Sequence, residues 1–154
     1  MAEGPAGLLG EVRGFLEGLR LEWPEVFAAP RRVAPAPRPK GRHAEMFHER
    51  ASFWAGRLGV TFGAVRVKGQ RTLWGSCSRR GNLNFNWRLT LAPPEILDYV
   101  VVHELAHRLE MNHSPRFWAI VERHCPDHTT HRRWLRKNGS ALYLDKAESR
   151  VQPG

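Results

Sequence analysis

The spacing of apolar residues along the chain changes twice, and each change predicts a different kind of element. Residues 8–19 and 43–58 carry apolar side chains three or four positions apart, which is the spacing of an amphipathic helix. Residues 29–42, between them, are rich in proline and arginine and are predicted to form an extended or disordered basic linker. The inward positions of the second helix are expected to be Met46, Phe47, Phe53, Trp54 and Leu58. Gly59 is expected to end this helix.

Between residues 60 and 91 the apolar period shortens to two, which is typical of strands. Val65 and Val67 alternate with basic residues, and the sequence Arg-Arg-Gly-Asn at 79–82 predicts a turn. Apolar and polar residues then alternate strictly over residues 83–91. This alternation indicates a half-buried antiparallel strand.

Proline and capping residues predict the helices that follow. Pro93-Pro94 opens a helix, because proline is tolerated in the first helical turn. Its apolar stripe consists of Leu97, Val101, Leu105 and Leu109. Ser114-Pro115 supplies the N-cap and first residue of a second helix, which Pro126 ends. A last basic segment, residues 131–137, is expected to end at Asn138-Gly139.

Length and composition indicate one domain of ordinary size. A chain of 154 residues can bury one core, and we predict an N-terminal helix and linker over 1–42, a domain over 43–140 and a tail over 141–154. The formal net charge of +9 predicts a surface that attracts anions, such as nucleotides or nucleic acid.

The two cysteines and the apolar runs suggest where the protein works. Cys77 and Cys125 lie far apart, which excludes a disulfide framework and a cysteine zinc ribbon and favours a reducing compartment. The N-terminus lacks a basic start followed by an apolar run, and no apolar stretch approaches the roughly 18 residues of a membrane span. We therefore expect a cytoplasmic protein without a membrane partner.

The segment His103-Glu104-Leu105-Ala106-His107 carries the clearest chemistry. Histidines at i and i+4 stand one turn apart on the same helical face, so both imidazoles can reach one zinc ion. Glu104 lies beside them as a general base for the water that zinc activates. The apolar run Tyr99–Val102 precedes His103, so the helix is expected to be buried, where these polar groups would be costly without a metal.

Geometry narrows the choice of a third ligand. Zn–N bonds are about 2.0–2.1 Å long, so two ligand atoms on one zinc lie no more than ~4 Å apart. Glu110 is excluded, because it lies roughly 10.5 Å along an intact helix from His103. His113 can complete the site if the helix stops near Asn112, which tolerates a left-handed conformation. His113 is favoured, and Glu122 on the following helix is the alternative.

The remaining candidates are assigned to the core or the surface. Cys77 is expected to be a small buried residue rather than a ligand. The tryptophans expected in the core are Trp54, Trp87, Trp118 and Trp134. The histidines expected at the surface are His43, His48, His124, His128 and His131. The basic residues that could attract phosphates are Arg79, Arg80, Arg132, Arg133, Arg136 and Lys137.

Several segments together resemble the YgjP-like metallopeptidase domain, a minimal zincin related to SprT-like and WLM-type metalloproteases. They are R-T-L-W-G-S-C-S at 71–78, G-N-L-N-F-N-W-R-L at 81–89, H-E-L-A-H at 103–107 and N-H-S-P-R-F-W at 112–118. The resemblance implies an α+β zincin-like fold, in which a small antiparallel sheet packs on an active-site helix with further helices. It also implies one zinc per chain, with His103, His107 and His113 as ligands and Glu104 as the catalytic residue.

Three functional hypotheses follow. The leading one is a zinc-dependent metallopeptidase acting on proteins or peptides. In zincins the edge strand above the active-site helix pairs with an extended peptide, which makes the predicted strand 83–91 the candidate and Asn84, Asn86 and Arg88 its substrate-binding residues. The first alternative is a metal-dependent nucleoside triphosphate pyrophosphatase, an activity to which members of the resembled family have been linked. The second alternative is a DNA-associated protease or a nucleic-acid-binding zinc protein.

Overall fold

The computed structural model describes residues 41–144. The elements within them are α2 (Gly41–Leu58), β1 (Val65–Lys68), β2 (Gly75–Cys77), β3 (Leu83–Asn86), the 3-10 helix η1 (Trp87–Leu91), α3 (Pro94–Ala106), α4 (Pro115–His124), α5 (His128–Asn138) and α6 (Ala141–Leu144). The predicted helix at 8–19, nearly all of the predicted linker and the end of the predicted tail lie outside the described residues.

The three strands form one mixed sheet in the order β1-β3-β2. β2 pairs with β3 in the antiparallel sense, as predicted, whereas β1 pairs with β3 in parallel. β3 is therefore the central strand, and the prediction that residues 83–91 form the edge strand is wrong. The sheet is therefore mixed rather than wholly antiparallel, since β3 has an antiparallel partner on one edge and a parallel partner on the other.

The predicted strand 83–91 is also too long. β3 ends at Asn86, whose side chain accepts a hydrogen bond from the backbone N–H of Arg88 and so caps η1. An asparagine that satisfies a free N–H in this way starts a helical turn in place of a further ladder step. The alternation after Asn86 consequently belongs to η1, in which Trp87, Arg88 and Leu89 are all buried.

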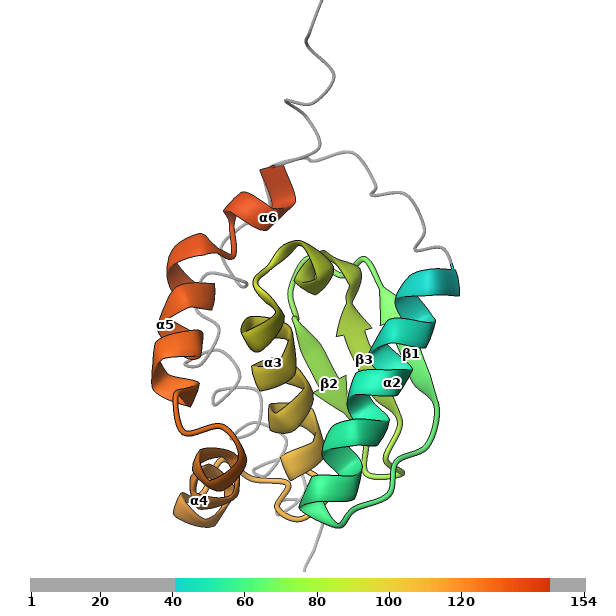
Figure 1. Cartoon of the computed structure of the whole chain (residues 1–154), viewed down its shortest axis with the longest axis vertical. Coiled ribbons are helices and arrows are strands. Elements are labelled where there is room, and N and C mark those ends of the chain that lie inside the picture. Colours follow the sequence, from blue (N-terminus) through green and yellow to red (C-terminus); the bar gives the residue numbers. More distant parts are fainter. Residues whose placement is uncertain (1–40, 145–154) are drawn as a thin grey trace, which may run out of the picture.

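Two helices lie side by side over one face of the sheet (Figure 1). α2 packs on β1 and α3 packs on β2, and the two helices contact each other. Arg50 of α2 makes a bidentate ion pair with Asp98 of α3, which joins the helices at this contact. α4 and α5 pack against α3, and α5 lies on the side of it away from α2 (Figure 1). This arrangement is the α+β, zincin-like fold predicted from the sequence.

α3 is the central helix of the domain. Every residue from Tyr99 to His107 is buried. The predicted stripe is correct for Leu97, Val101 and Leu105, but Leu109 is 50% exposed because it lies beyond the helix. A helix covered on all sides is apolar around its whole circumference rather than along one stripe. The polar side chains that α3 does bury are therefore expensive and must have partners or a function.

α2 shows the amphipathic pattern expected of it, with one exception. Phe47, Ala51 and Ala55 are buried, and the helix ends at Gly59, whose φ of 69° is the left-handed conformation that glycine tolerates. Phe53, predicted to face inward, is 45% exposed. Its ring lies under the guanidinium groups of Arg50 and Arg57, at 4.9 and 4.7 Å from the ring centroid, so cations cover it in place of the core.

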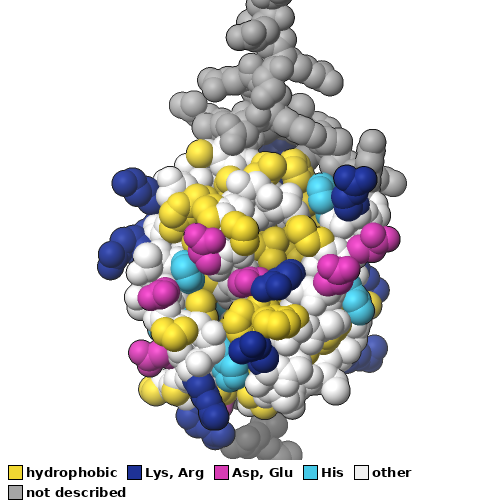
Figure 2. Space-filling model, in the orientation of Figure 1, with side chains coloured by type: hydrophobic (Ala, Val, Ile, Leu, Met, Phe, Trp, Pro, Cys, Tyr) yellow, Lys and Arg dark blue, Asp and Glu magenta, His cyan; other side chains and the backbone are white. Residues whose placement is uncertain are grey.

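The packed body continues four residues beyond the predicted boundary at 140. α6 packs against η1, and its Leu142 is buried. Acidic and basic side chains are mixed on the face in Figure 2, and Lys and Arg lie mainly toward its rim. Among residues 41–144, no helix is both long and apolar enough to cross a membrane.

Candidate metal centre

The site is built where α3 ends. His103 and His107 lie one turn apart on α3, and their ring centroids are 5.2 Å apart. The helix ends at Ala106, earlier than the predicted end near Asn112, and His107 is its C-cap. The N–H groups of Arg108 and Leu109 donate to the carbonyls of Leu105 and Ala106, so a tight turn follows directly. No residue other than glycine has a positive φ among residues 41–144, so the predicted left-handed Asn112 is wrong.

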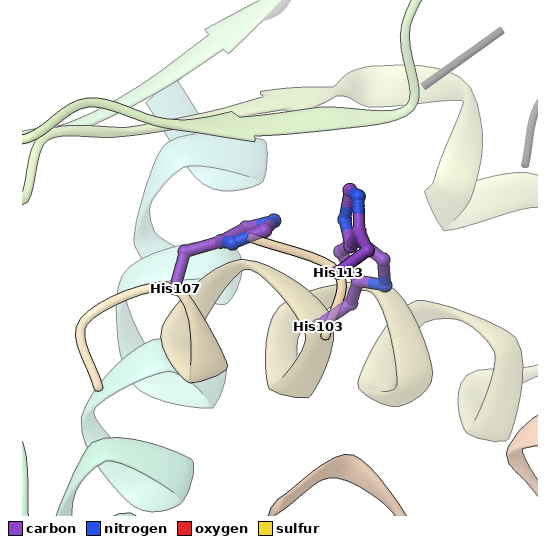
Figure 3. Close-up of side chains that lie close together, drawn as sticks. All are labelled: His103, His107 and His113. Atoms are coloured by element: carbon purple, nitrogen blue, oxygen red, sulfur yellow. The ribbon is translucent and has the colours of Figure 1, made fainter. Parts of the chain in front are cut away.

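His113 returns to the same side of α3 because the next helix is anchored nearby. Ser114 is the N-cap of α4, and its side chain accepts a hydrogen bond from the N–H of Phe117 at 3.3 Å, as its sequence predicted. Phe117 is fully buried and packs against all three imidazoles, at centroid distances of 4.9 Å from His103, 4.6 Å from His107 and 4.8 Å from His113. Figure 3 shows the three rings gathered beside α3.

The three imidazoles fit a single metal ion. One ligand atom from each lies within 4.8 Å of the others, and the Nε2 atoms of His103 and His113 are 3.2 Å apart. A tetrahedral zinc at about 2.0–2.1 Å from each nitrogen requires a separation of roughly 3.3 Å. Binding of such an ion would draw the wider separations toward this value. Glu122, the alternative third ligand, is not part of this group.

A hydrogen bond to the ring of His107 supports the same fit. His107 Nδ1 lies 3.1 Å from the carbonyl oxygen of Glu110. A carbonyl can only accept, so Nδ1 carries the proton and Nε2 presents its lone pair, as metal-binding histidines require. The Glu110 carboxylate lies 3.9 Å from the guanidinium of Arg116 and away from the triad. Glu110 thus contributes through its backbone, whereas its side chain is not a member of the metal-ligating group.

Burial keeps these histidines neutral. Desolvation lowers the pKa of His103 well below its ordinary value, and the pKa of His113 falls to about 4 for the same reason. Desolvation also lowers the pKa of His107. A neutral imidazole has a lone pair for a cation, so all three rings are in their ligating form at neutral pH without proton loss.

Glu104 lies beneath the edge strand β2. Its side chain is 2% exposed, and a Cβ atom added to Gly75 would lie 2.9 Å from its Cγ and Oε1 atoms. Only glycine therefore lets β2 approach the carboxylate this closely. The neighbouring Cys77 is buried, as predicted, and burial together with the charge of Glu104 raises the pKa of its thiol to about 12.

Of the three predicted substrate residues, Asn84 and Asn86 lie two positions apart on β3 and share a face, whereas Arg88 lies beyond the strand. Asn84 of β3 donates through Nδ2 to Ser76 Oγ of β2 and is partly buried. Asn86 is buried and donates to the carbonyls of Gln70 and Leu73 and to the Tyr143 hydroxyl. Arg88 lies in η1, only 5% exposed. These positions favour packing roles for Asn86 and Arg88, and substrate contact by Asn84 stays a prediction.

Two residues near the triad were not predicted to lie beside the metal site. His128 and Arg132 of α5 both contact Trp118, which also packs against His103 and His113. His128 is half-buried rather than fully exposed, and its ring stacks on Trp118 at a centroid distance of 5.4 Å. Their shared i, i+4 spacing on one helix was the available signal.

Comparison with known proteins agrees with this geometry. A family model described as "YgjP-like, metallopeptidase domain" matches residues 39–138, which is more than half of the chain and includes the triad and Glu104. No curated protein and no solved structure matches the chain. The metal-binding group and the matched span together support a metal-dependent hydrolase, and the chain belongs to the family of YgjP-like metallopeptidase domains.

Proposed function

We propose that the protein is a zinc-dependent metallopeptidase that cleaves protein or peptide substrates. The observation that carries the proposal is the convergence of three neutral imidazoles beside a buried carboxylate. Three histidines leave an open coordination position, whereas structural zinc sites are usually closed by four protein ligands. The donor set therefore supports a catalytic role for one zinc ion per chain.

The roles of the residues follow from their positions. His103, His107 and His113 hold the ion, and the carbonyl of Glu110 orients the ring of His107. Bound zinc supplies a Lewis acid that polarises the substrate carbonyl and activates water. Glu104 accepts the proton of the attacking water and returns it to the leaving amine. Enclosure by β2 holds this carboxylate in place, since Gly75 lies directly against it.

β2 provides a place for an extended peptide. The hydrogen-bonded sheet order ends at β2, so within residues 41–144 no strand pairs with its outer edge. A peptide that added to this edge would run past Glu104, which lies against Gly75. This position supports β2, in place of the predicted strand 83–91, as the strand that aligns a substrate over the triad.

One observation favours a second function. The positive charge of Arg132 lies close enough to lower the pKa values of His103 and His113. A cation beside a metal suits a phosphoryl substrate, as does the net charge of +9. The alternative proposal is therefore a metal-dependent nucleoside triphosphate pyrophosphatase that uses the same residues.

One experiment tests both functions. Purified protein is assayed on casein and on nucleoside triphosphates, each with and without a chelator. We expect casein cleavage that the chelator abolishes and that Glu104→Gln reduces by at least about 100-fold while zinc is retained. Glu49→Gln, which removes an exposed carboxylate from α2, is the matched control and should leave turnover unchanged. Chelator-resistant turnover, or full activity of Glu104→Gln, would overturn the mechanism, and turnover of nucleotides alone would establish the alternative.

A further inference from the structure

The face that α5 turns toward α3 is unusually polar. α5 packs against α3, and its buried residue is Leu135. His128, His131 and Arg132 lie seven, four and three positions before Leu135, so they share its helical face. The ring of His131 lies 6.2 Å from that of Tyr99 on α3. A helix that packs on a buried neighbour ordinarily presents apolar side chains there, so these three polar residues stand where core residues are expected.

Trp118 connects this face to the metal centre. The guanidinium carbon of Arg132 lies 5.4 Å from the Trp118 ring centroid, and the His128 ring stacks on Trp118 at 5.4 Å with an interplanar angle of 24°. The same indole lies 5.9 Å from His103 and 6.1 Å from His113. Trp118 thus contacts both the triad and the two polar residues of α5.

Two nitrogen atoms in this cluster are buried without a hydrogen bond. They are Arg132 Nε and His128 Nδ1. Leaving a buried donor unpaired costs about 1–3 kcal/mol, so such groups in native proteins usually serve a purpose besides packing. Burial lowers the pKa of His128 and the nearby Glu122 opposes this, but no ion pair joins Glu122 to Arg132 among the described residues. The guanidinium therefore keeps its charge available to another anion.

We propose that Arg132 and His128 form an anion-binding subsite beside the triad, in which Arg132 holds a carboxylate or phosphoryl oxygen of the substrate. The inference rests on the proposed hydrolase and narrows its substrates to those with a negative group near the cleaved bond. Arginine suits this task, because its planar fork matches both carboxylate and phosphate oxygens. Trp118 supports the guanidinium through its ring, and His128 stacks on the same indole.

A bound anion would balance an excess of positive charge at the subsite. Zinc held by three neutral histidines keeps its double positive charge, and Glu104 offsets one unit of it. Arg132 adds a further positive charge near His103 and His113. A substrate carboxylate or phosphoryl group would balance this excess. If Arg132 served only in packing, its substitution would change anion affinity no more than the removal of another positive charge from α5.

Direct titration tests the subsite in the full chain. Inorganic phosphate is titrated in one arm and N-acetylglycine in the other, against metal-free and zinc-loaded protein, with binding followed by amide chemical shifts in NMR spectra. The variants are Arg132→Gln, Arg132→Lys and Arg133→Gln. The last is the matched control, since it removes the same charge from an exposed position on the same helix.

We expect Arg132→Gln to raise the dissociation constant of the bound probe by about 10-fold or more, which is the effect of losing a charge-assisted hydrogen bond. Arg132→Lys should lie between it and the original protein, and remains informative if the glutamine variant does not fold. Arg133→Gln should change binding by less than about 2-fold at physiological salt. Tighter binding of phosphate would identify a phosphoryl substrate, and tighter binding of N-acetylglycine a peptide carboxylate.

Equal effects of Arg132→Gln and Arg133→Gln would overturn the subsite, as would a lack of binding of both probes to the original protein. Zinc content separates this result from a failure of the proposed function. If Arg132→Gln binds zinc normally but loses the probe, both proposals stand. If the original protein binds no zinc, the hydrolase proposal fails, while the arginine dependence in the metal-free titration still decides the subsite.

Discussion

The start and the end of α3 both bury polar side chains, but they do so in different ways. Beside the start of the helix, Asn86 donates to two backbone carbonyls and to the Tyr143 hydroxyl, and the Arg88 guanidinium lies 4.3 Å from the Tyr143 ring. At the end of the helix, three histidine nitrogens converge within 4.8 Å of one another. In the first cluster the Asn86 amide is paired with acceptors, whereas the second brings together three imidazole nitrogens.

This difference distinguishes a structural polar cluster from a candidate site. A hydrogen bond between a buried donor and a buried acceptor offsets part of the free energy lost when both leave water. The Asn86 cluster can therefore hold η1 and α6 in place without a ligand. Three lone pairs that face one point repel one another unless a cation lies between them. The Asn86 cluster should therefore contribute stability, and the histidine triad should contribute ion binding.

The largest expected effect is on metal affinity. His103→Ala removes one of three ligands and should weaken zinc binding by more than roughly 100-fold, since the loss of outer-shell partners alone costs up to about that much. His48→Ala, which removes an exposed imidazole from α2, is the control. Zinc content per chain after gel filtration is the measurement. An unchanged zinc content in His103→Ala would show that the triad is not the metal site.

The next effect concerns the carboxylate beside the triad. Gly75→Ala places a methyl group 2.9 Å from Glu104 and 3.1 Å from Val100, so one of them must move. We expect turnover to fall by at least about 10-fold with zinc retained, and stability to fall by about 1–3 kcal/mol.

Gly56→Ala in α2 meets nothing within 4 Å and is the matched control. It should stabilise the protein by about 0.5–1 kcal/mol, because alanine favours a helix over glycine. Denaturant unfolding and steady-state kinetics measure both variants. Normal turnover in Gly75→Ala would mean that the position of Glu104 does not matter to the reaction.

Asn86→Ala should lower stability and leave zinc binding unchanged, whereas His103→Ala should mainly weaken zinc binding. Asn86→Ala leaves two carbonyls and the Tyr143 hydroxyl without their shared donor, and we expect a loss of about 1–3 kcal/mol in unfolding free energy. Zinc content should not change. A loss of zinc in Asn86→Ala that matched the loss in His103→Ala would remove the distinction between the two ends of α3.

The smallest effect is expected when the metal-free protein is acidified from pH 7 to about pH 6.5. Burial lowers the pKa values of His103, His107 and His113, so the unfolded chain takes up protons before the folded chain does. Stability should therefore fall as the pH drops through the ordinary histidine pKa, and continue to fall until the folded rings also protonate, which for His113 occurs at about 4. Thermal melts across this range would show a flat profile if the rings were not buried neutral.

Sequence information was sufficient for features that depend on neighbouring residues. The start of α3 at Pro94, the cap at Ser114 and the glycine that ends α2 each follow from local chemistry. The gathering of His103, His107 and His113 needs only a helix and one turn. The gathering of these three side chains could therefore be predicted largely from residues close to them in the sequence.

Features that depend on distant partners could not be predicted in this way. An alternating pattern identifies β1 and β3 but does not give the direction in which they pair. The pattern also continues past Asn86, although the cap on Arg88 starts η1 there. Basic residues on a helix usually face solvent, so the sequence did not reveal that Arg132 turns toward Trp118. Only the packing of α5 on α3 decides that orientation.

The triad and the site of Glu104 differ in the sequence separation between the residues that form them. The three histidines lie within residues 103–113, so ordering one helix end and one turn assembles them at little cost in loop-closure entropy. Glu104 is enclosed only after β2 has come from nearly thirty residues upstream and placed Gly75 over it. The three histidines can therefore come together before the sheet docks on α3, whereas the enclosure of Glu104 depends on that docking. A partly folded chain would then have the three histidines in place without the enclosed carboxylate that the proposed hydrolysis uses.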